Sequence, residues 1–123
     1  MTSSSPQKPS PPPTLKARKD FLACARARRW AAPGMVVQGR ARGDDKGLRV
    51  GYTCSKKVGN AVARNRAKRR LRAAAADVLP RAGLPGWDYV LIGRAGTTAS
   101  RPFPQLLADL ETALGRIHAP RKK

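Results

Sequence analysis

Apolar and polar residues alternate along residues 48–55, which is the pattern of a β-strand with one buried face. The order is Leu48, Arg49, Val50, Gly51, Tyr52, Thr53, Cys54 and Ser55. A second strand is predicted at Met35–Gln38, and the Gly- and Asp-containing segment 43–47 lies between the two. We therefore expect an antiparallel pair joined by this turn, with a polar face that is free to contact something other than the core.

Two longer segments have helical periodicity, and an apolar run lies between them. In residues 60–79 the apolar positions recur at steps of three and four and form one stripe, namely Ala63, Ala67, Leu71, Ala74 and Val78. Pro80 is expected to end this helix. A last helix is predicted from about Ser100, with Pro102 in its first turn and a core stripe of Phe103, Leu106, Leu107, Leu110, Leu114 and Ile117. Residues 87–92 form the most apolar run and predict a central strand.

The two ends of the chain differ from the middle. Residues 1–14 contain five prolines and no branched or aromatic apolar side chain, which predicts a disordered tail. From Leu15 the pattern indicates a short basic helix of about three turns that ends at Pro33-Gly34. We expect a single domain over residues 15–118 and a basic C-terminal tail at 119–123.

The charge of the chain indicates a polyanionic partner. There are 26 Lys and Arg residues against seven Asp and Glu, which gives a formal net charge of +19. Nucleic acid is the first partner to consider for such a chain. The apolar runs are only as long as strands, so we expect no membrane partner, no signal peptide and a cytoplasmic location.

Positive charge is concentrated between Lys46 and Ala76, where ten Lys or Arg residues occur without a single Asp or Glu. Arg64 and Lys68 stand four residues apart on the predicted helix, and like charges at this spacing destabilise a helix. We interpret this face as a surface for phosphate groups, with a merely solvated face as the alternative. The six aromatic residues are too few for an extensive base-stacking platform. Phe21 and Tyr52 either stack on a base or fill the core.

Few residues are available for covalent or metal chemistry. Cys24 and Cys54 have no metal-ligand spacing, and they are expected to be small reduced thiols. His118 is the only histidine, and near a basic terminus it is expected to be solvated. No arrangement for nucleophilic or acid–base catalysis can be assembled, so we expect no catalytic residue and no protein-bound cofactor or metal.

The sequence KKVGNAVARNRAKRRLR at residues 56–72 resembles the KKxGxAVxRNRxKRxxR signature of the bacterial ribonuclease P protein family. Asp20-Phe21, Arg49-Val50-Gly51 and residues 88–92 also resemble the family, so the resemblance covers about residues 15 to 117. It implies an α/β fold, a two-layer sandwich like that of some ribosomal proteins. A mixed sheet of about four strands would pack with three helices, and the β-α-β crossover would be left-handed.

The resemblance also implies a function. The protein would be the accessory subunit of an endoribonuclease in which RNA carries out catalysis and removes the 5′ leader of precursor tRNA. The partners would be the catalytic RNA, with one protein per RNA, and precursor tRNA, while Mg²⁺ would be bound through the RNA. Implied contacts to the catalytic RNA are Lys56, Lys57, Asn60, Arg64, Asn65, Arg66, Lys68, Arg69 and Arg72. Implied contacts to the leader are Phe21, Gln38, Arg49, Thr53 and Ser55. Many members have aromatic residues where this chain has Ala25 and Gln38, so we expect less base stacking here.

Two other functions stay open from the sequence. Small basic α/β proteins with disordered ends are common in ribosomes, and a ribosomal protein needs no active site. A nucleoid-type DNA-binding protein is a weaker alternative, because nothing in the chain resembles a groove-reading helix-turn-helix or a dimerisation element.

Overall fold

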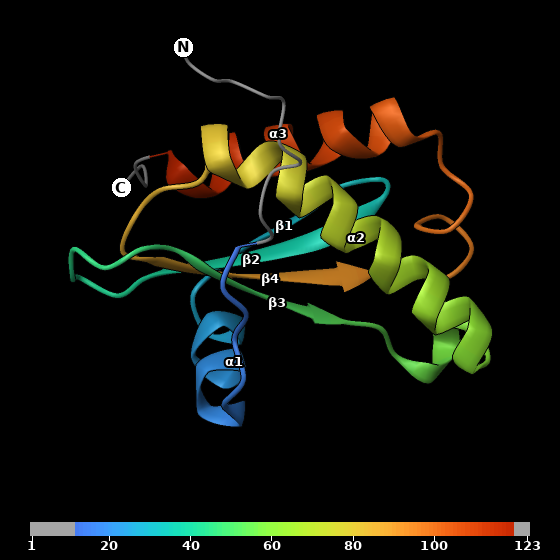
Figure 1. The fold of residues 1–123 in the computed structure, drawn as a ribbon, viewed down its shortest axis with the longest axis horizontal. Helices are drawn as coiled ribbons and strands as arrows, with labels where there is room; N and C mark the ends of the chain where they lie inside the picture. The colour runs from blue at the N-terminus through green and yellow to red at the C-terminus, as the bar shows by residue number, and fades with distance from the viewer. Residues whose placement is uncertain (1–11, 120–123) are drawn as a thin grey trace, which may run out of the picture.

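The chain folds into one mixed β-sheet with helices on both faces (Figure 1). The computed structural model describes residues 12–119, so most of the expected N-terminal tail and nearly all of the C-terminal tail lie outside the described residues. In chain order the elements are α1 (Arg18–Ala25), β1 (Arg28–Ala31), β2 (Met35–Ala41), β3 (Arg49–Thr53), the short 3-10 helix η1 (Lys56–Val58), α2 (Ala61–Ala82), β4 (Trp87–Gly93) and α3 (Phe103–His118). The predicted α/β class, with a mixed sheet of four strands and three helices, is confirmed.

The strand order in the sheet is β1-β2-β4-β3. Residues 87–92 are therefore central, as predicted, whereas the predicted antiparallel pair of β2 and β3 is wrong. β4 lies between them, antiparallel to β2 and parallel to β3. Tyr89, Val90 and Leu91 of β4 are all buried, and a strand with two apolar faces is stable only with cover on both faces and a neighbour on each side.

The segment between β2 and β3 crosses over the start of β4 instead of closing a hairpin. The backbone N–H of Arg42 donates to the carbonyl of Gly86 at 2.7 Å, and the N–H of Gly86 donates to the carbonyl of Lys46 at 2.6 Å. Gly86 has a φ of 78°, a conformation that favours glycine. The Gly- and Asp-rich turn expected at 43–47 thus exists, but it bridges two strands that do not pair with each other.

The first helix is shorter than predicted. α1 has eight residues, and Arg28–Ala31 form β1, which pairs antiparallel with β2. Pro33-Gly34 is the turn of this β-hairpin, because the N–H of Ala32 donates to the carbonyl of Met35 at 2.9 Å. A basic segment such as 26–31 can form either a helix or a strand. Residues 28–31 form a strand because they pair with the buried strand β2.

The two faces of the sheet are covered by different helices, as Figure 1 shows, with α2 and α3 on one face and α1 on the other. The helical stripes are confirmed: Ala67, Leu71, Ala74 and Val78 of α2 are buried, as are Leu106, Leu110, Leu114 and Ile117 of α3. They form the main core with Met35, Val37, Val50, Tyr89 and Leu91. A smaller core on the other face joins Leu15, Cys24 and Val90.

The ends of the helices correct two further expectations. α2 continues two residues beyond Pro80, which lies in its last turn, so Pro80 does not end the helix. His118 at the end of α3 is half-buried rather than solvated, because the helix ends beside the Trp87 and Tyr89 rings. Its Nε2 forms a 2.7 Å hydrogen bond with the Tyr89 hydroxyl.

The described chain joins the sheet at Pro13, slightly before the expected domain start at Leu15. The N–H of Val50 donates to the carbonyl of Pro13, and the N–H of Leu15 donates to the carbonyl of Val50. Cys24 is buried and Cys54 half-buried, and both are free thiols, as predicted. None of the helices within residues 12–119 has both the length and the apolar character needed to cross a membrane.

Candidate nucleic-acid interface

The loop that leads into α2 is held in its conformation by hydrogen bonds from its own side chains to its backbone. The Ser55 Oγ accepts a hydrogen bond from the Lys57 N–H at 3.2 Å, and the Asn60 Oδ1 accepts one from the Ala63 N–H at 3.0 Å and so caps α2. Gly59 between them has a φ of 138°, which disfavours any residue with a side chain. These local bonds hold Lys56 and Lys57, both exposed, at the N-terminal end of α2.

The polar face of α2 carries the remaining residues predicted to bind the catalytic RNA. Asn65, Arg66, Arg69 and Arg72 are exposed, and Arg64 and Lys68 are half-buried. Within residues 12–119, no Asp or Glu oxygen lies within 4.0 Å of the charged nitrogen atoms of these arginines and this lysine. The positive face seen in the sequence therefore persists in the folded structure without compensation from the described acidic groups.

Three arginines of α2 differ in the contacts that their guanidinium groups make. Arg70 turns away from this face, because its Nη1 and Nη2 donate to the carbonyls of Thr98 and Arg101 at 2.8 and 2.5 Å. Arg72 lies with its guanidinium carbon 5.6 Å from the centre of the Tyr52 ring. Arg64 has a buried Nε without a hydrogen-bond partner in the described structure. Arg70 thus supports the fold, and the others retain donors for a ligand.

A second polar surface lies on the α1 face of the sheet. Because side chains alternate along a strand, Gln38 of β2 and Arg49 and Thr53 of β3 belong to this face, together with Val90 and Ile92 of β4. A depression of about 410 Å³ is lined by Lys16, Arg18, Phe21 and Thr53. We call this surface, made by Lys16, Arg18, Phe21, Gln38, Arg49 and Thr53, the sheet cleft.

The sheet cleft includes two residues that sequence reasoning missed. Lys16 and Arg18 line it beside the partly buried Phe21, and the basic residues shortly before this aromatic residue were the available signal. The predicted residue Ser55 is exposed just beyond β3 and is not among the residues that line the depression. It connects the sheet cleft to the loop that caps α2, through its hydrogen bond to Lys57.

Arg49 of the sheet cleft is held by a buried carboxylate. Its Nε and Nη2 donate to Oδ1 and Oδ2 of Asp88 at 2.9 and 2.8 Å, and Asp20 of α1 lies 3.6 Å from its Nη1. Asp88 is fully buried and also accepts a bond from Arg42 at 2.6 Å, with Arg40 at 3.6 Å. Burial raises the pKa of Asp88, but the hydrogen bonds from Arg49 and Arg42 outweigh it and hold the pKa below its ordinary value.

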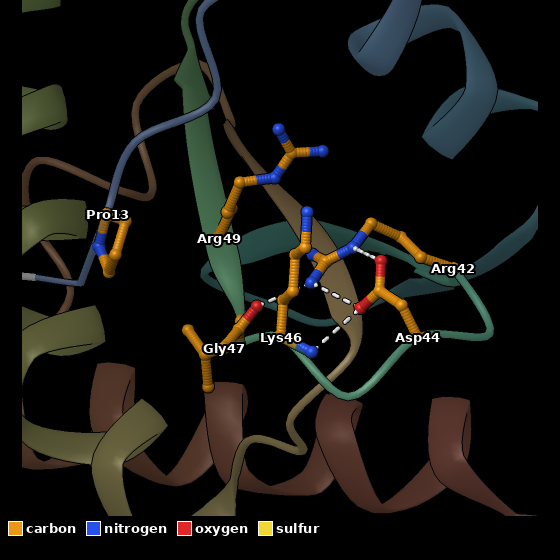
Figure 2. Close-up of a pocket in the computed structure, with 7 residues that line it drawn as sticks. Pro13, Arg42, Asp44, Lys46, Gly47 and Arg49 are labelled. Carbon is orange, nitrogen blue, oxygen red and sulfur yellow. Dashed lines mark hydrogen bonds and ion pairs between the residues drawn. The ribbon is translucent and has the colours of Figure 1, made fainter.

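A neighbouring hollow of about 430 Å³ is lined by Arg42 and Arg49, and here too an arginine is bound by a carboxylate (Figure 2). Figure 2 shows the Arg42 side chain directed at Asp44, and its Nε and Nη2 both donate to that carboxylate at 3.0 Å. Nη2 also donates to the carbonyl of Gly47 at 2.6 Å. The donors of Arg42 are occupied within the protein, so this hollow supports the loop between β2 and β3 and does not offer a free anion site.

The described residues provide little for metal binding. Within residues 12–119 no group of three His, Cys, Asp or Glu side chains lies close enough to hold a metal ion. Asp88 is the most buried carboxylate of the chain described here, and arginines surround its oxygens. The exposed lysines and arginines of the two polar surfaces are suited to binding an anionic polymer.

Comparison with known proteins relates the chain to a protein family. A family model described as Ribonuclease P matches residues 11–118. The chain is 66% identical over 109 residues to a ribonuclease P protein component from Ruegeria pomeroyi, with 87% of each chain covered. It is 54% identical over 113 residues to one from Paramagnetospirillum magneticum, covering 88% of this chain and 84% of the relative.

Solved structures agree in fold. The ribonuclease P protein of Staphylococcus aureus superimposes with a TM-score of 0.69 at 26% identity, over 85% of this chain and 94% of that protein. The protein of Thermotoga maritima superimposes with a TM-score of 0.68 at 27% identity, over 86% of this chain and 98% of that protein. These findings favour the ribonuclease P family over the alternatives of a ribosomal protein and a nucleoid-type DNA binder.

Proposed function

The chain belongs to the ribonuclease P protein family, and from this premise we propose that its two polar surfaces bind two different RNAs. As a protein subunit of ribonuclease P it acts in tRNA processing with an RNA partner. In our proposal the polar face of α2 binds the catalytic RNA, and the sheet cleft binds the single-stranded 5′ leader of precursor tRNA. One protein binds one RNA.

The observation that carries this proposal is that no acidic group among residues 12–119 pairs with the polar face of α2. Arg64 and Lys68, and Lys68 and Arg72, are like-charged pairs four residues apart, and such pairs each destabilise a helix by a few tenths of a kcal/mol. RNA phosphates remove this repulsion and accept bidentate hydrogen bonds from arginine. The family signature at residues 56–72 occupies the same face.

The sheet cleft supports binding of a single strand. Phe21 provides one aromatic ring, Lys16 and Arg18 provide positive charge, and Gln38 and Thr53 provide hydrogen-bonding groups. A surface with a single ring depends more on phosphate contacts than on base stacking. We therefore expect tolerance of leader sequence and a strong dependence of binding on salt concentration.

The proposed reaction is hydrolysis of one phosphodiester bond, which leaves a 5′-phosphate on the mature tRNA. Magnesium ions held by the RNA would activate water and stabilise the leaving oxygen. The side chains described in this protein do not fit a magnesium site, so no step is assigned to a protein-bound metal. The protein contributes by holding the leader beside the RNA, which increases the affinity for precursor tRNA relative to the product that lacks the leader.

Reconstitution tests the proposal. Purified protein and its catalytic RNA are assayed for cleavage of precursor tRNA at low magnesium, with and without the protein. We expect cleavage to depend on the protein at low magnesium. Holoenzyme affinity is then measured for precursor tRNA and for leaderless tRNA over a range of salt concentrations.

The two measurements test the two proposed RNA contacts separately: the salt series tests the leader contact, and cleavage at low magnesium tests the contact with the catalytic RNA. Affinity for the leader should fall with salt with a log-log slope of about −0.7 for each phosphate contacted on a single strand. Equal affinity for both tRNAs at every salt concentration would remove the role of the sheet cleft. Cleavage that is independent of the protein at low magnesium would remove the role of the α2 face.

A further inference from the structure

The side of α1 that is turned away from the sheet carries a basic surface. Successive residues of an α-helix are rotated by about 100°, so Arg18, Lys19, Leu22 and Arg26 fall on one side of α1, and the buried Cys24 falls on the other. The four side chains are exposed, and even the apolar Leu22 is 42% exposed. We call these four residues the outer α1 face.

The positive charges of the outer α1 face have no acidic partner in the part of the chain that the structure describes. No carboxylate oxygen of residues 12–119 lies within 4.0 Å of the charged nitrogen atoms of Arg18, Lys19 or Arg26. Asp20 is the single acidic residue of α1, and its side chain is only 16% exposed, with Oδ2 3.6 Å from Nη1 of Arg49. The acid of this helix is therefore directed at the sheet, and the three cations remain available to an anion.

Two of these cations lie where they oppose the helix itself. Arg18 and Lys19 are the first two residues of α1, and the positive end of the helix dipole lies at this terminus. Ala17 at the N-cap has no side-chain hydrogen bond that could offset the effect. Positive charge therefore weakens this end of α1, and a bound phosphate would relieve it. The like-charged pairs on the polar face of α2 have the same relationship to phosphate.

The outer α1 face begins at the sheet cleft. Arg18 belongs to both surfaces, because it also lines the depression beside Phe21. Going round the helix from Phe21, Arg18 comes first, and Leu22 and Arg26 follow, while Asp20 lies on the opposite side. A polyanion that leaves the sheet cleft past Arg18 therefore continues along cations and stays away from the acid of the helix.

The direction of the leader fits this path. In the proposed function the polar face of α2 binds the catalytic RNA, so the leader nucleotides next to the cleavage site lie near α2. The helices α1 and α2 cover opposite faces of the sheet (Figure 1). Nucleotides further from the cleavage site are therefore expected on the α1 side, where the outer α1 face offers positive charge.

We propose that the outer α1 face binds the 5′ part of the leader, upstream of the nucleotides that lie in the sheet cleft. The inference rests on the proposed function and deepens it. Lys19 and Arg26 contact phosphates, and Leu22 contacts a ribose or a base. Contacts to phosphate carry no sequence information, so this face adds affinity for long leaders of many sequences.

The dimensions give the leader lengths that separate the two surfaces. From Thr53 on β3 to Gln38 on β2 the sheet cleft spans two strand spacings of about 4.8 Å, which a stacked strand crosses with about three nucleotides. The rise of the helix from Arg18 to Arg26 adds about 12 Å, which corresponds to roughly three to four further nucleotides.

The test uses the reconstituted holoenzyme and two precursor tRNAs, with leaders of about three and about ten nucleotides. The variants are Lys19→Ala, Arg26→Ala, the double variant, and the charge-conserving Lys19→Arg and Arg26→Lys. Arg116→Ala is the matched control. Arg116 is also exposed and has no carboxylate oxygen of residues 12–119 within 4.0 Å, but it lies on α3, over the opposite face of the sheet. Thermal melts followed by circular dichroism verify that each variant is folded.

The long leader should respond to the variants and the short leader should not. Each single alanine variant should raise the Kd for the long-leader substrate about three- to five-fold at about 0.1 M salt, and the double variant about ten-fold or more. The double variant should also reduce the magnitude of the log-log salt slope for the long leader by about 1.4, which is about 0.7 for each lost phosphate. The charge-conserving variants should retain most of the affinity, and Arg116→Ala should behave as the wild type.

Three results would overturn the proposal. The first is an unchanged Kd for the long leader in the folded double variant. The second is an equal loss for long and short leaders, which would assign the outer α1 face to the catalytic RNA or the tRNA body. The third is a loss of the same size in Arg116→Ala, which would mean that overall charge alone matters. In each case a wild type that still binds precursor tRNA more tightly than leaderless tRNA leaves the proposed function intact, and a wild type that does not overturns that function itself.

Discussion

The ring of Phe21 lies directly over Gly51, so close that a β-carbon at Gly51 would be 2.5 Å from two ring carbons. The absence of a side chain at residue 51 therefore sets the depth at which the aromatic ring of the sheet cleft lies on β3. α1 and the sheet are coupled at this point, because Phe21 comes from the helix and also contacts the smaller core with Leu15 and Cys24.

Gly51→Ala should displace Phe21 and weaken leader binding more than it weakens the fold. Overpacking of this kind typically costs about 1–3 kcal/mol of stability, and the displaced ring loses its position for stacking on a base. The measurement is the ratio of holoenzyme affinities for precursor and leaderless tRNA. Gly47→Ala is the control, because a β-carbon there has no neighbour within 4 Å. An unchanged ratio in a folded Gly51→Ala variant would show that Phe21 does not contact the leader.

Arg66→Ala and Arg69→Ala should each weaken binding of the catalytic RNA while the fold stays intact. Both side chains are exposed, and exposed charges contribute little to stability. Each lost phosphate contact should reduce the magnitude of the log-log salt slope of binding by about 0.7 to 0.9. Filter binding over a salt series measures this slope, and an Arg66→Ala protein that unfolds at room temperature would contradict its position on the surface.

Leu71→Ala should have the opposite effect. Leu71 lies on the buried side of the same helix, and the loss of a buried leucine side chain typically costs about 2–5 kcal/mol. Chemical denaturation should show this loss, while RNA affinity measured well below the melting temperature should change little. A stable Leu71→Ala protein would mean that α2 packs with a different face against the core.

Asp88→Asn should destabilise the protein by about 3–5 kcal/mol, because it removes the buried carboxylate that Arg42 and Arg49 contact. The pKa of Asp88 lies below its ordinary value of 3.8. Its ionised form therefore contributes stability above that value, and the contribution is lost as the pH falls through the lower folded-state pKa. Denaturation at several acidic pH values should show a flatter profile for Asp88→Asn than for the wild type. Asp45→Asn, a change at an exposed residue of the loop between β2 and β3, should leave the profile as it is.

His118 should make stability sensitive to pH near neutrality. Burial, with a contribution from nearby Arg28, lowers the pKa of His118 below its ordinary value of 6.5. The neutral form is therefore the stable one in the folded state, and stability is complete above 6.5 and falls as the pH drops from 6.5 towards the folded-state pKa. Urea denaturation between about pH 7.5 and 5.5 measures this loss. His118 is the only histidine of the chain, so His118→Gln should remove most of the dependence.

Features that depend on neighbours along the chain could be predicted from the sequence. The periodicity of Ala67, Leu71, Ala74 and Val78 places the apolar stripe of α2 on one side because the helix geometry alone determines which residues share a face. The same geometry puts Arg66 and Arg69 on the solvent side. The motif at residues 56–72 was recognisable for the same reason, since its loop and helix are local structures capped by their own side chains.

Strand order and side-chain partners were decided only in the tertiary structure. The segments that became β2 and β3 could be recognised as strands, but the insertion of β4 between them depends on burial of both faces of a strand far away in the sequence. Arg49 donates hydrogen bonds to Asp88, and Arg70 donates to the carbonyls of Thr98 and Arg101. These contacts likewise join residues that meet only after folding. The sequence by itself determined which residues share a helix face and that the charge is positive. Only the tertiary structure decided which arginines are bound internally and which remain free, because ion pairs form between side chains that the fold brings together across long separations in the chain.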